Sequence, residues 1–330
     1  MNVDIVGGSG FIGTRLSRRL SQAETIRFSI IDKAPSALFP ERVKIADVRS
    51  IDSLRATVTA DSVVVHLAAE HRDDVRPLSL YDEVNVQGAK NLCVVAREKG
   101  VKTIVFTSTV AVYGFAPIGT DESGMIAPFN DYGRTKYEAE LAFKAWQAEA
   151  PSIRTLVIVR PTVVFGEQNR GNVFNLLRQI ASGRFVMVGD GKNRKSMAYV
   201  ENIAAFLEFA ITLKPGVHIY NYIDKPDFTM NNLVGTVNRM LGKSAAIGFR
   251  LPFVVGFMIG KVFDLAAAIT GRRFAISSIR VKKFCANSVY NTALETSGFL
   301  PPVSLSDALE RTVRHEFIES HDHEGVFYTE

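Results

Sequence analysis

A tyrosine and a lysine near the middle of the chain have the spacing of an acid-base pair on a helix. Tyr132 and Lys136 are four residues apart, which places their side chains one turn apart on the same face of a helix. A nearby ammonium stabilises phenolate and lowers the pKa of the phenol, so Tyr132 could act as a base near neutral pH. The same spacing also arises by chance on solvent-exposed helix faces.

A run of hydroxyl side chains supplies candidate partners for this pair. Thr107-Ser108-Thr109 follows a short apolar run that is typical of a buried strand. In open α/β sheets, ligands bind beyond the carboxyl ends of the strands. The sequence therefore predicts that these hydroxyls emerge where a ligand binds.

A glycine-rich turn follows the first apolar run. Gly7, Gly10 and Gly13 permit a tight turn, close approach of the backbone to a pyrophosphate and close packing of the next helix. Asp32 ends the second predicted strand, where a carboxylate binds a ribose diol and repels a 2′-phosphate. This pattern favours NAD over NADP, although Lys33 weakens the exclusion of NADP. An ordinary tight turn between a strand and a helix is the alternative.

The elements that must position these residues alternate along the first half of the chain. Short β-branched runs separated by helical patterns predict an α/β fold, with a Rossmann-like doubly wound parallel sheet. We expect this NAD-binding domain to cover residues 1–165, with a return segment at about 196–212. Residues 166–195 and 213–330 are expected to form a smaller C-terminal substrate-binding lobe.

Composition excludes several other classes of protein. Hydrophobic residues make up 47% and charged residues 22% of the 330 residues, which excludes a disordered or collagen-like chain. Cys93 and Cys285 lack metal-ligand spacing, so we expect no metal site and a reducing, cytoplasmic compartment. The N-terminus shows no secretion signal.

The net charge is +5, and residues 250–290 hold seven basic residues against one acidic residue. This asymmetry indicates a surface or an anionic ligand rather than nucleic acid.

Further short motifs accompany the two predicted sites. They are Asp47-Val48, His66-Leu67-Ala68-Ala69, Asn85-Val86-Gln87-Gly88 and Arg160-Pro161. With the glycine turn, the hydroxyl run and the Tyr132/Lys136 pair, they resemble the extended short-chain dehydrogenase/reductase superfamily, and within it the NAD-dependent sugar epimerases and dehydratases. The resemblance implies that Thr109, Tyr132 and Lys136 are catalytic, with Tyr132 as the base. The cofactor-binding residues that it implies are Gly7, Gly10, Phe11, Ile12, Gly13, Asp32, Lys33, Asp47, Val48, Leu67, Ala68, Ala69, Asn85, Thr107, Tyr132 and Lys136.

The resemblance also implies a reaction at C4 of a sugar. Tyr132 would take the proton of the 4-hydroxyl while a hydride leaves C4, and the 4-keto sugar would take the hydride back on its other face. Dehydratases of the superfamily carry an acidic pair after the catalytic threonine, where this chain has Val110 and Ala111. Epimerisation is therefore favoured. The alternatives are a reductase that consumes NADH and a binding protein that uses NAD as a signal.

A closer resemblance rests on residues 68–75, 160–166, 169–173, 195–200, 220–226 and 281–285. These stretches resemble bacterial enzymes that epimerise N-acetylglucosamine at C4 for surface polysaccharide such as O-antigen, on a UDP or an undecaprenyl-diphosphate carrier. The resemblance implies a homodimer and a diphosphate site. The substrate-binding residues that it implies are Thr109, Tyr132, Arg170, Asn172, Lys195 and Arg280. Lys195 stands where an arginine is usual, which gives a point charge in place of a bidentate fork.

One apolar stretch indicates a membrane surface. Residues 251–270 are long enough to span a bilayer, but Lys261 and Asp264 interrupt them at a combined insertion cost of about 5 to 7 kcal/mol. Because these two charges share one helix face, the pattern favours a helix that lies in the interface. Arg272 and Arg273 would add attraction to anionic lipid. We thus expect a peripheral protein on the cytoplasmic face of the inner membrane; buried helices in the substrate lobe are the alternative.

Overall fold

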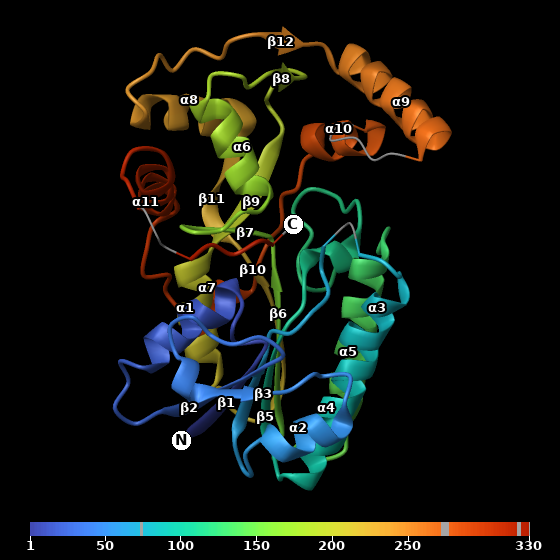
Figure 1. Ribbon diagram of the computed structural model, residues 1–330, viewed down its shortest axis with the longest axis vertical. Helices are drawn as coiled ribbons and strands as arrows, with labels where there is room; N and C mark the ends of the chain where they lie inside the picture. Colours follow the sequence, from blue (N-terminus) through green and yellow to red (C-terminus); the bar gives the residue numbers. More distant parts are fainter. Residues whose placement is uncertain (73–74, 272–276, 322–324, 330) are drawn as a thin grey trace.

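A seven-stranded parallel sheet forms the larger lobe (Figure 1). The computed structural model describes residues 1–72, 75–271, 277–321 and 325–329. In spatial order the strands are β10 (Gly216–Tyr222), β6 (Thr155–Pro161), β5 (Thr103–Thr107), β4 (Val63–His66), β1 (Asn2–Val6), β2 (Arg27–Asp32) and β3 (Val43–Ile45). All neighbouring strands pair in parallel. The predicted doubly wound parallel sheet is confirmed.

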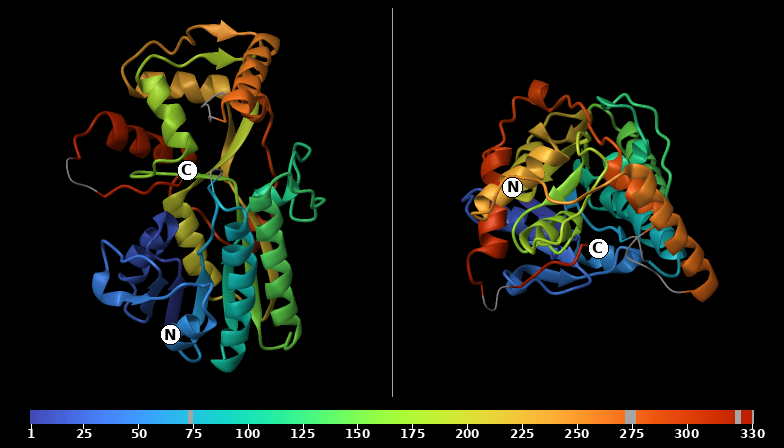
Figure 2. Two further views of the ribbon diagram at one scale, coloured as in Figure 1. Left: turned by 45° about the vertical axis from the view of Figure 1, so that its right-hand side comes forward. Right: turned by 90° about the horizontal axis from the view of Figure 1, so that it is seen from above.

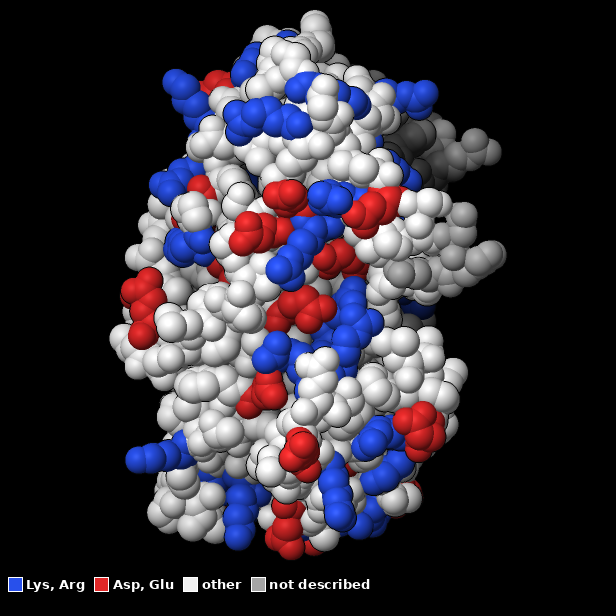
Figure 3. All heavy atoms as spheres, turned by 90° about the vertical axis from the view of Figure 1, so that its left-hand side faces the viewer, with Lys and Arg blue, Asp and Glu red and all other residues white. Residues whose placement is uncertain are grey.

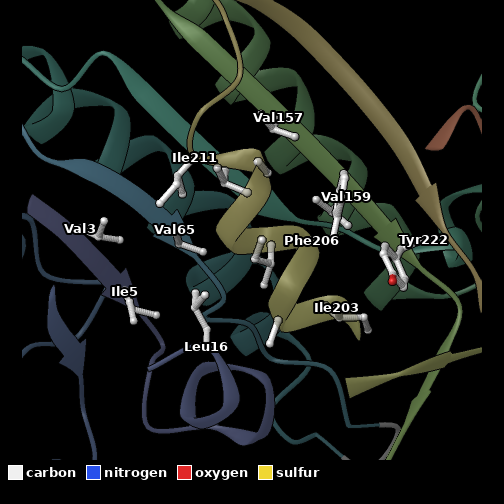
Figure 4. Packing of buried hydrophobic residues seen from close by; sticks show 14 of the residues in the cluster. Val3, Ile5, Leu16, Val65, Val157, Val159, Ile203, Phe206, Ile211 and Tyr222 are labelled. Atoms are coloured by element: carbon white, nitrogen blue, oxygen red, sulfur yellow. The ribbon is translucent and has the colours of Figure 1, made fainter. Parts of the chain in front are cut away.

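Helices cover both faces of this sheet, which explains why its central strands are apolar throughout. One face carries α1 (Phe11–Leu20) and α7 (Val200–Ala210). The other carries α2 (Ile51–Thr57), α4 (Gly88–Glu98) and α5 (Asp131–Ala148). Figure 4 shows the core beneath α7, where Phe206 lies among side chains of the strands. The second core, beneath α4 and α5, contains the buried Trp146.

The register of the strands brings the functional segments to one edge. Val6 lies opposite Ile31 of β2 and His66 of β4, and His66 lies opposite Phe106 of β5. The segments that follow these four strands therefore emerge side by side.

The smaller lobe lies beyond this edge (Figures 1 and 2). Its three-stranded sheet has the order β11 (Asp224–Thr229), β9 (Arg194–Tyr199) and β7 (Val163–Phe165), and a two-stranded sheet pairs β12 (Arg250–Leu251) with β8 (Met187–Val188). Its helices are α6 (Asn172–Ala181), α8 (Met230–Met240), α9 (Phe253–Thr270), α10 (Ser278–Cys285) and α11 (Leu305–Phe317). The short helical turns of the molecule are η1 (Pro40–Arg42), α3 (Ser79–Tyr81), the π-helix η2 (Asp82–Gln87), η3 (Val110–Tyr113) and η4 (Leu294–Ser297).

The return of the chain to the large lobe differs from the expected segment. The helix α7 packs against the large sheet, but β9 pairs within the smaller lobe. The chain then continues into β10, which extends the large sheet beside β6, although the sequence placed residues 216–222 in the substrate lobe. Burial of Tyr222 against Phe206 of α7 accounts for this extra strand.

Candidate active site

The glycine turn between β1 and α1 packs against the backbone that follows β4. Gly7 has a φ of +81°, and a Cβ there would overlap the backbone of Ala68. A Cβ at Gly13 would lie 2.5 Å from the Cα of Gly8. Gly10 is the N-cap of α1 and contributes no side-chain cap, so the first amides of this helix can bind an anion.

Asp32 lies beside this turn at the end of β2. Its carboxylate accepts hydrogen bonds from the backbone amides of Ser9 and Ala34, each at 3.0 Å. These two bonds fix the carboxylate at the rim of the turn and leave lone pairs for the hydroxyls of a ribose. Lys33, the next residue, is exposed.

The segments after β3 and β4 form the walls of the turn. Leu67, Ala68 and Ala69 are half-buried directly beyond β4, and the amides of Leu67 and Ala68 donate to the Val6 carbonyl. After β3, Val48 is buried. The carboxylate of Asp47 pairs with Arg49 at 2.7 Å, and this hydrogen bond lowers the pKa of Asp47.

Asn85 holds the wall that follows β4. Its side chain exchanges two hydrogen bonds with the backbone of Glu70 and donates a third, at 3.0 Å, to the Thr135 hydroxyl of α5. Because both amide hydrogens have protein partners, Asn85 positions the segment after β4. Its predicted direct contact with the cofactor stays a prediction.

Tyr132, Lys136 and Thr109 lie together at the end of β5. Asn130 caps α5 and accepts a hydrogen bond from the Gly133 amide at 3.0 Å, which places Tyr132 in the first turn. Thr109 caps η3 and hydrogen-bonds with the Tyr132 side chain. Lys136 is 2% exposed, and its Nζ lies 4.2 Å from the ring centroid of Phe106.

Burial shifts the pKa values of the two titratable groups in opposite directions. Exclusion of water raises the pKa of Tyr132 to about 12, against the opposing effect of the Thr109 hydrogen bond. The same cause lowers the pKa of Lys136 to about 7, and the carboxylate of Glu140 opposes that shift. Strongly perturbed groups in a ligand cleft are typical of catalytic sites.

These residues fit a dinucleotide. A side chain at position 7 would overlap the backbone that follows β4, so only glycine fits this turn. The first amides of α1 have no capping side chain, and Asp32 is held at the rim of the turn. In addition, the buried Thr107 hydroxyl has no hydrogen-bond partner among the described residues, so a ligand would satisfy it.

Comparison with known proteins agrees with this geometry. The model of the NAD-dependent epimerase/dehydratase family matches residues 3–222. This chain belongs to that family. The resemblance noted in the sequence is thus confirmed, and so is NAD as the cofactor.

Individual relatives cover the whole chain. The chain is 46% identical to the N-acetyl-alpha-D-glucosaminyl-diphospho-ditrans,octacis-undecaprenol 4-epimerase of Escherichia coli O157:H7, over 100% of this chain and 99% of that protein. It is 27% identical to the UDP-glucose 4-epimerase of Vibrio cholerae, over 94% of each. Its fold is similar to that of the Thermotoga maritima UDP-glucose 4-epimerase solved with UDP-glucose, with a TM-score of 0.74 at 20% identity, covering 96% of this chain and 98% of that one.

A buried polar network lies beside Lys136 and Thr109. Glu140, one turn beyond Lys136 on α5, accepts two hydrogen bonds from the Arg160 guanidinium, at 2.9 and 2.6 Å, and one from the Ser108 hydroxyl at 2.6 Å. Arg160 also donates to the Tyr113 hydroxyl at 2.6 Å. The sequence analysis gave Glu140, Arg160 and Tyr113 no role, and it placed the Ser108 hydroxyl where a ligand binds, whereas that hydroxyl is buried against Glu140. The spacing of Tyr132, Lys136 and Glu140 on one helix face was the available signal.

Lys195 and Arg170, which the sequence predicts as diphosphate ligands, contact protein groups of the smaller lobe. The ammonium of Lys195 donates to the carbonyls of Lys283 and Ala286 at 2.8 and 2.7 Å, at the C-terminal end of α10. Arg170 pairs with Glu316 of α11 at 2.7 Å. In this arrangement Lys195 and Arg170 hold the smaller lobe together, because helix C-terminal carbonyls and a carboxylate attract cations.

The other two predicted ligands lie at helix starts. Asn172 is the first residue of α6, and Arg280 lies in the first turn of α10; both side chains are exposed. Binding of a diphosphate by these four residues stays a prediction.

Proposed function

We propose that this enzyme is an NAD-dependent 4-epimerase that interconverts N-acetylglucosamine and N-acetylgalactosamine attached to undecaprenyl diphosphate, at the cytoplasmic membrane surface. The Escherichia coli relative, 46% identical over the full length, is named for the undecaprenyl-linked substrate. The observation that favours the lipid carrier over UDP in this chain is the exposed apolar face of α9.

The chain's own residues account for proton transfer at C4. The Tyr132 oxygen accepts the proton of the 4-hydroxyl and returns it, and Thr109 orients the phenol through their shared hydrogen bond. When protonated, Lys136, one turn away, provides the positive charge that favours phenolate. When bound, NAD supplies the group that accepts the hydride from C4 and gives it back. Val110 and Ala111 offer no acid or base for dehydration.

The helix α9 presents apolar side chains to solvent. It is long and apolar enough to cross a membrane, yet only 11% of it is buried in the protein. The alternative of a buried helix in the substrate lobe is therefore contradicted. The apolar side chains of α9 that are at least 40% exposed are Phe253, Val254, Val255, Met258, Ile259, Val262, Leu265 and Ile269. An exposed apolar surface of this kind marks a contact with a membrane or a protein.

The acidic residue within α9 is turned toward the protein. The carboxylate of Asp264 accepts a hydrogen bond from the Ser278 hydroxyl at 2.5 Å, at the start of α10. A Cβ at Gly260 would lie 2.7 Å from the Cα of Ser278, so the two helices cross closely. The apolar face therefore carries no carboxylate, which suits a helix that lies in the headgroup region.

Cations accompany the apolar face. The helix α10 carries Arg280, Lys282 and Lys283 and no acidic residue, whereas Arg272 and Arg273 lie outside the described residues. On the face formed by α1 and α7, by contrast, cations alternate with carboxylates, as in the 2.7 Å pair of Arg19 and Glu208 (Figure 3). The α9 and α10 end of the molecule is thus better suited to anionic lipid than the face of α1 and α7.

The α10 helix also contacts a loop that leads from the catalytic site. The Nζ atoms of Lys282 and Lys283 lie 5.0 and 4.8 Å from the ring centroids of Phe115 and Phe129. Phe115 closely follows η3, which Thr109 caps. A lipid chain entering along α9 would therefore arrive beside the reacting sugar.

The deciding experiment compares two donors. Purified enzyme should convert polyprenyl-diphosphate N-acetylglucosamine and leave UDP-N-acetylglucosamine nearly unchanged. Efficient conversion of the UDP sugar alone would replace the proposal with a soluble nucleotide-sugar epimerase. Net consumption of added NADH would identify a reductase.

A second experiment tests the membrane surface. The wild type should sediment with anionic liposomes, and Val254→Glu/Val262→Glu should stay in the supernatant because both side chains lie on the exposed face, 69% and 65% exposed. Ile153→Glu/Leu300→Glu alters two exposed apolar residues elsewhere, 55% and 85% exposed, and should sediment like the wild type. Equal sedimentation of all three proteins would exclude α9 as the contact.

We also propose a homodimer that forms through the outer faces of α4 and α5. The two helices pack side by side on the large sheet, and Leu141 of α5 is 46% exposed. The assembly is testable by sedimentation, with Leu141→Glu expected to weaken it.

A further inference from the structure

The C-terminal residues return from the smaller lobe to the cofactor turn. The helix α11 ends at Phe317, and residues 325–329 lie between the two lobes (Figures 1 and 2). We refer to residues 325–329 as the C-terminal strap.

The strap is fixed by main-chain hydrogen bonds to the segment that joins the lobes. The Phe327 amide donates to the Gln168 carbonyl at 2.8 Å, and the Arg170 amide donates to the Phe327 carbonyl at 2.7 Å. The Thr329 hydroxyl donates to the Asn169 side chain at 2.6 Å. This short parallel bridge gives the strap a defined register.

The Phe327 ring lies on the residue that begins the cofactor helix. Its centroid is 5.7 Å from that of Phe11, the first residue of α1 directly after Gly10. Phe11 is 7% exposed and belongs to the core of the smaller lobe, against which Phe327 also packs. The strap thus covers the start of the helix whose amides face the pyrophosphate site.

The far end of the strap reaches the opposite wall. The backbone of Thr329 hydrogen-bonds to the ring of His71, in the segment that follows β4 beyond Ala69. The strap therefore contacts Phe11, directly after the glycine turn, on one side and His71, in the segment after β4, on the other. These are the two walls between which the geometry places the dinucleotide.

We infer that the C-terminal strap closes over bound NAD and slows its release, with Phe327 as its principal contact. The inference rests on the proposed epimerisation, in which the hydride returns to the sugar and the dinucleotide has no need to leave between turnovers. A reductase, which must exchange NADH for NAD⁺ in every cycle, would gain nothing from such a closure.

The test measures NAD retention in the absence of sugar. Wild type and Phe327→Ala are loaded with NAD and passed through a desalting column, and the retained dinucleotide is released by heat and quantified. Phe327→Ala should release NAD at least tenfold faster. Tyr328→Ala is the matched control, because Tyr328 is 72% exposed and its ring faces solvent.

Two further measurements keep the outcomes separate. Far-UV circular dichroism and thermal unfolding show whether Phe327→Ala is folded. Thr329→Ala removes only one side-chain hydrogen bond of the strap and should release NAD at a rate between those of wild type and Phe327→Ala. Equal retention of NAD by wild type and folded Phe327→Ala would overturn the inference that the strap slows NAD release. Rapid release of NAD from the wild type would instead overturn the proposed epimerase, in which NAD has no need to leave between turnovers. The ratio of the NAD release rates of Phe327→Ala and wild type would still test the strap.

Discussion

Tyr132 and Lys136 lie in one site, and burial moves their pKa values apart. Burial raises the pKa of the phenol to about 12 and lowers that of the ammonium to about 7, so both groups are largely uncharged near pH 8 in the cofactor-free protein. The phenol must therefore lose its own proton before its oxygen can accept that of the 4-hydroxyl. Any added positive charge nearby would favour phenolate.

Removal of the phenol hydroxyl should abolish turnover. We expect Tyr132→Phe to retain NAD and to show no sugar conversion, because only the proton acceptor is lost. Thr109→Val should slow turnover by roughly 10² to 10⁴, the usual contribution of acid-base assistance. Tyr137→Phe, which alters another tyrosine of α5, is the control and should stay active. Measurable turnover by Tyr132→Phe at near wild-type rate would remove Tyr132 from the mechanism.

The buried lysine should make stability depend on pH. The pKa of Lys136 is about 7 in the folded protein, against an ordinary value of 10.5. Between these values the unfolded chain binds more protons than the folded one, so the free energy of unfolding should rise with pH. Urea unfolding of cofactor-free protein at pH 7, 8 and 9 should show this rise in the wild type relative to Lys136→Met. Parallel pH profiles for the two proteins would contradict it.

At the scale of the elements, the crossing of α9 and α10 depends on one glycine and one carboxylate. Gly260 permits contact with the backbone of Ser278, and Asp264 binds the start of α10. The pair in turn rests on Lys195, whose ammonium holds the end of α10. The exposed apolar residues are therefore carried on a braced pair of helices.

Substitution of this glycine should separate the two helices. We expect Gly260→Leu to raise proteolysis of α10 and to lower the free energy of unfolding by about 1 to 3 kcal/mol, the usual cost of overpacking. Gly248→Leu is the control, because a Cβ at Gly248 has no atom within 4 Å. Identical proteolysis of both variants would show that the crossing tolerates a side chain.

The sequence predicts those elements that local pattern determines. The glycine turn, Asp32 at the end of β2 and the Tyr132/Lys136 spacing are short-range features, and the structure places them as the patterns indicate. The partners of Lys195 lie about ninety residues away, so nothing near it in sequence reveals them. Likewise, α9 is apolar apart from Lys261 and Asp264, and a helix so apolar has the same sequence pattern whether protein or lipid covers it.

At the scale of the whole molecule, a buried network links the large sheet to the chain segment that precedes α11. The Tyr113 hydroxyl, bound by Arg160, donates to the Asn221 side chain of β10 at 2.8 Å. Asn221 in turn donates to the Asn291 carbonyl at 2.9 Å. The path thus runs from Arg160 of β6, through β10, to the chain that leads into α11.

Breaking the ion pair of this network should destabilise the whole molecule. Arg160→Met leaves the Glu140 carboxylate buried without its cation, and we expect a loss of about 3 to 5 kcal/mol in the free energy of unfolding. The double variant Arg160→Met/Glu140→Leu should recover much of that loss, because no uncompensated charge remains. Denaturant unfolding measures both, and equal losses in the single and double variants would contradict the argument.

The exposed face of α9 also bears on how copies of the protein meet in water. Without lipid, two such faces lower their free energy by covering each other, which would join two molecules through their smaller lobes with the large sheets at opposite ends. Nonionic detergent micelles would take the place of that second copy and separate the pair. A dimer built on α4 and α5 would survive the same micelles. Sedimentation with and without detergent therefore distinguishes a dimer that forms through α9 from one that forms through α4 and α5.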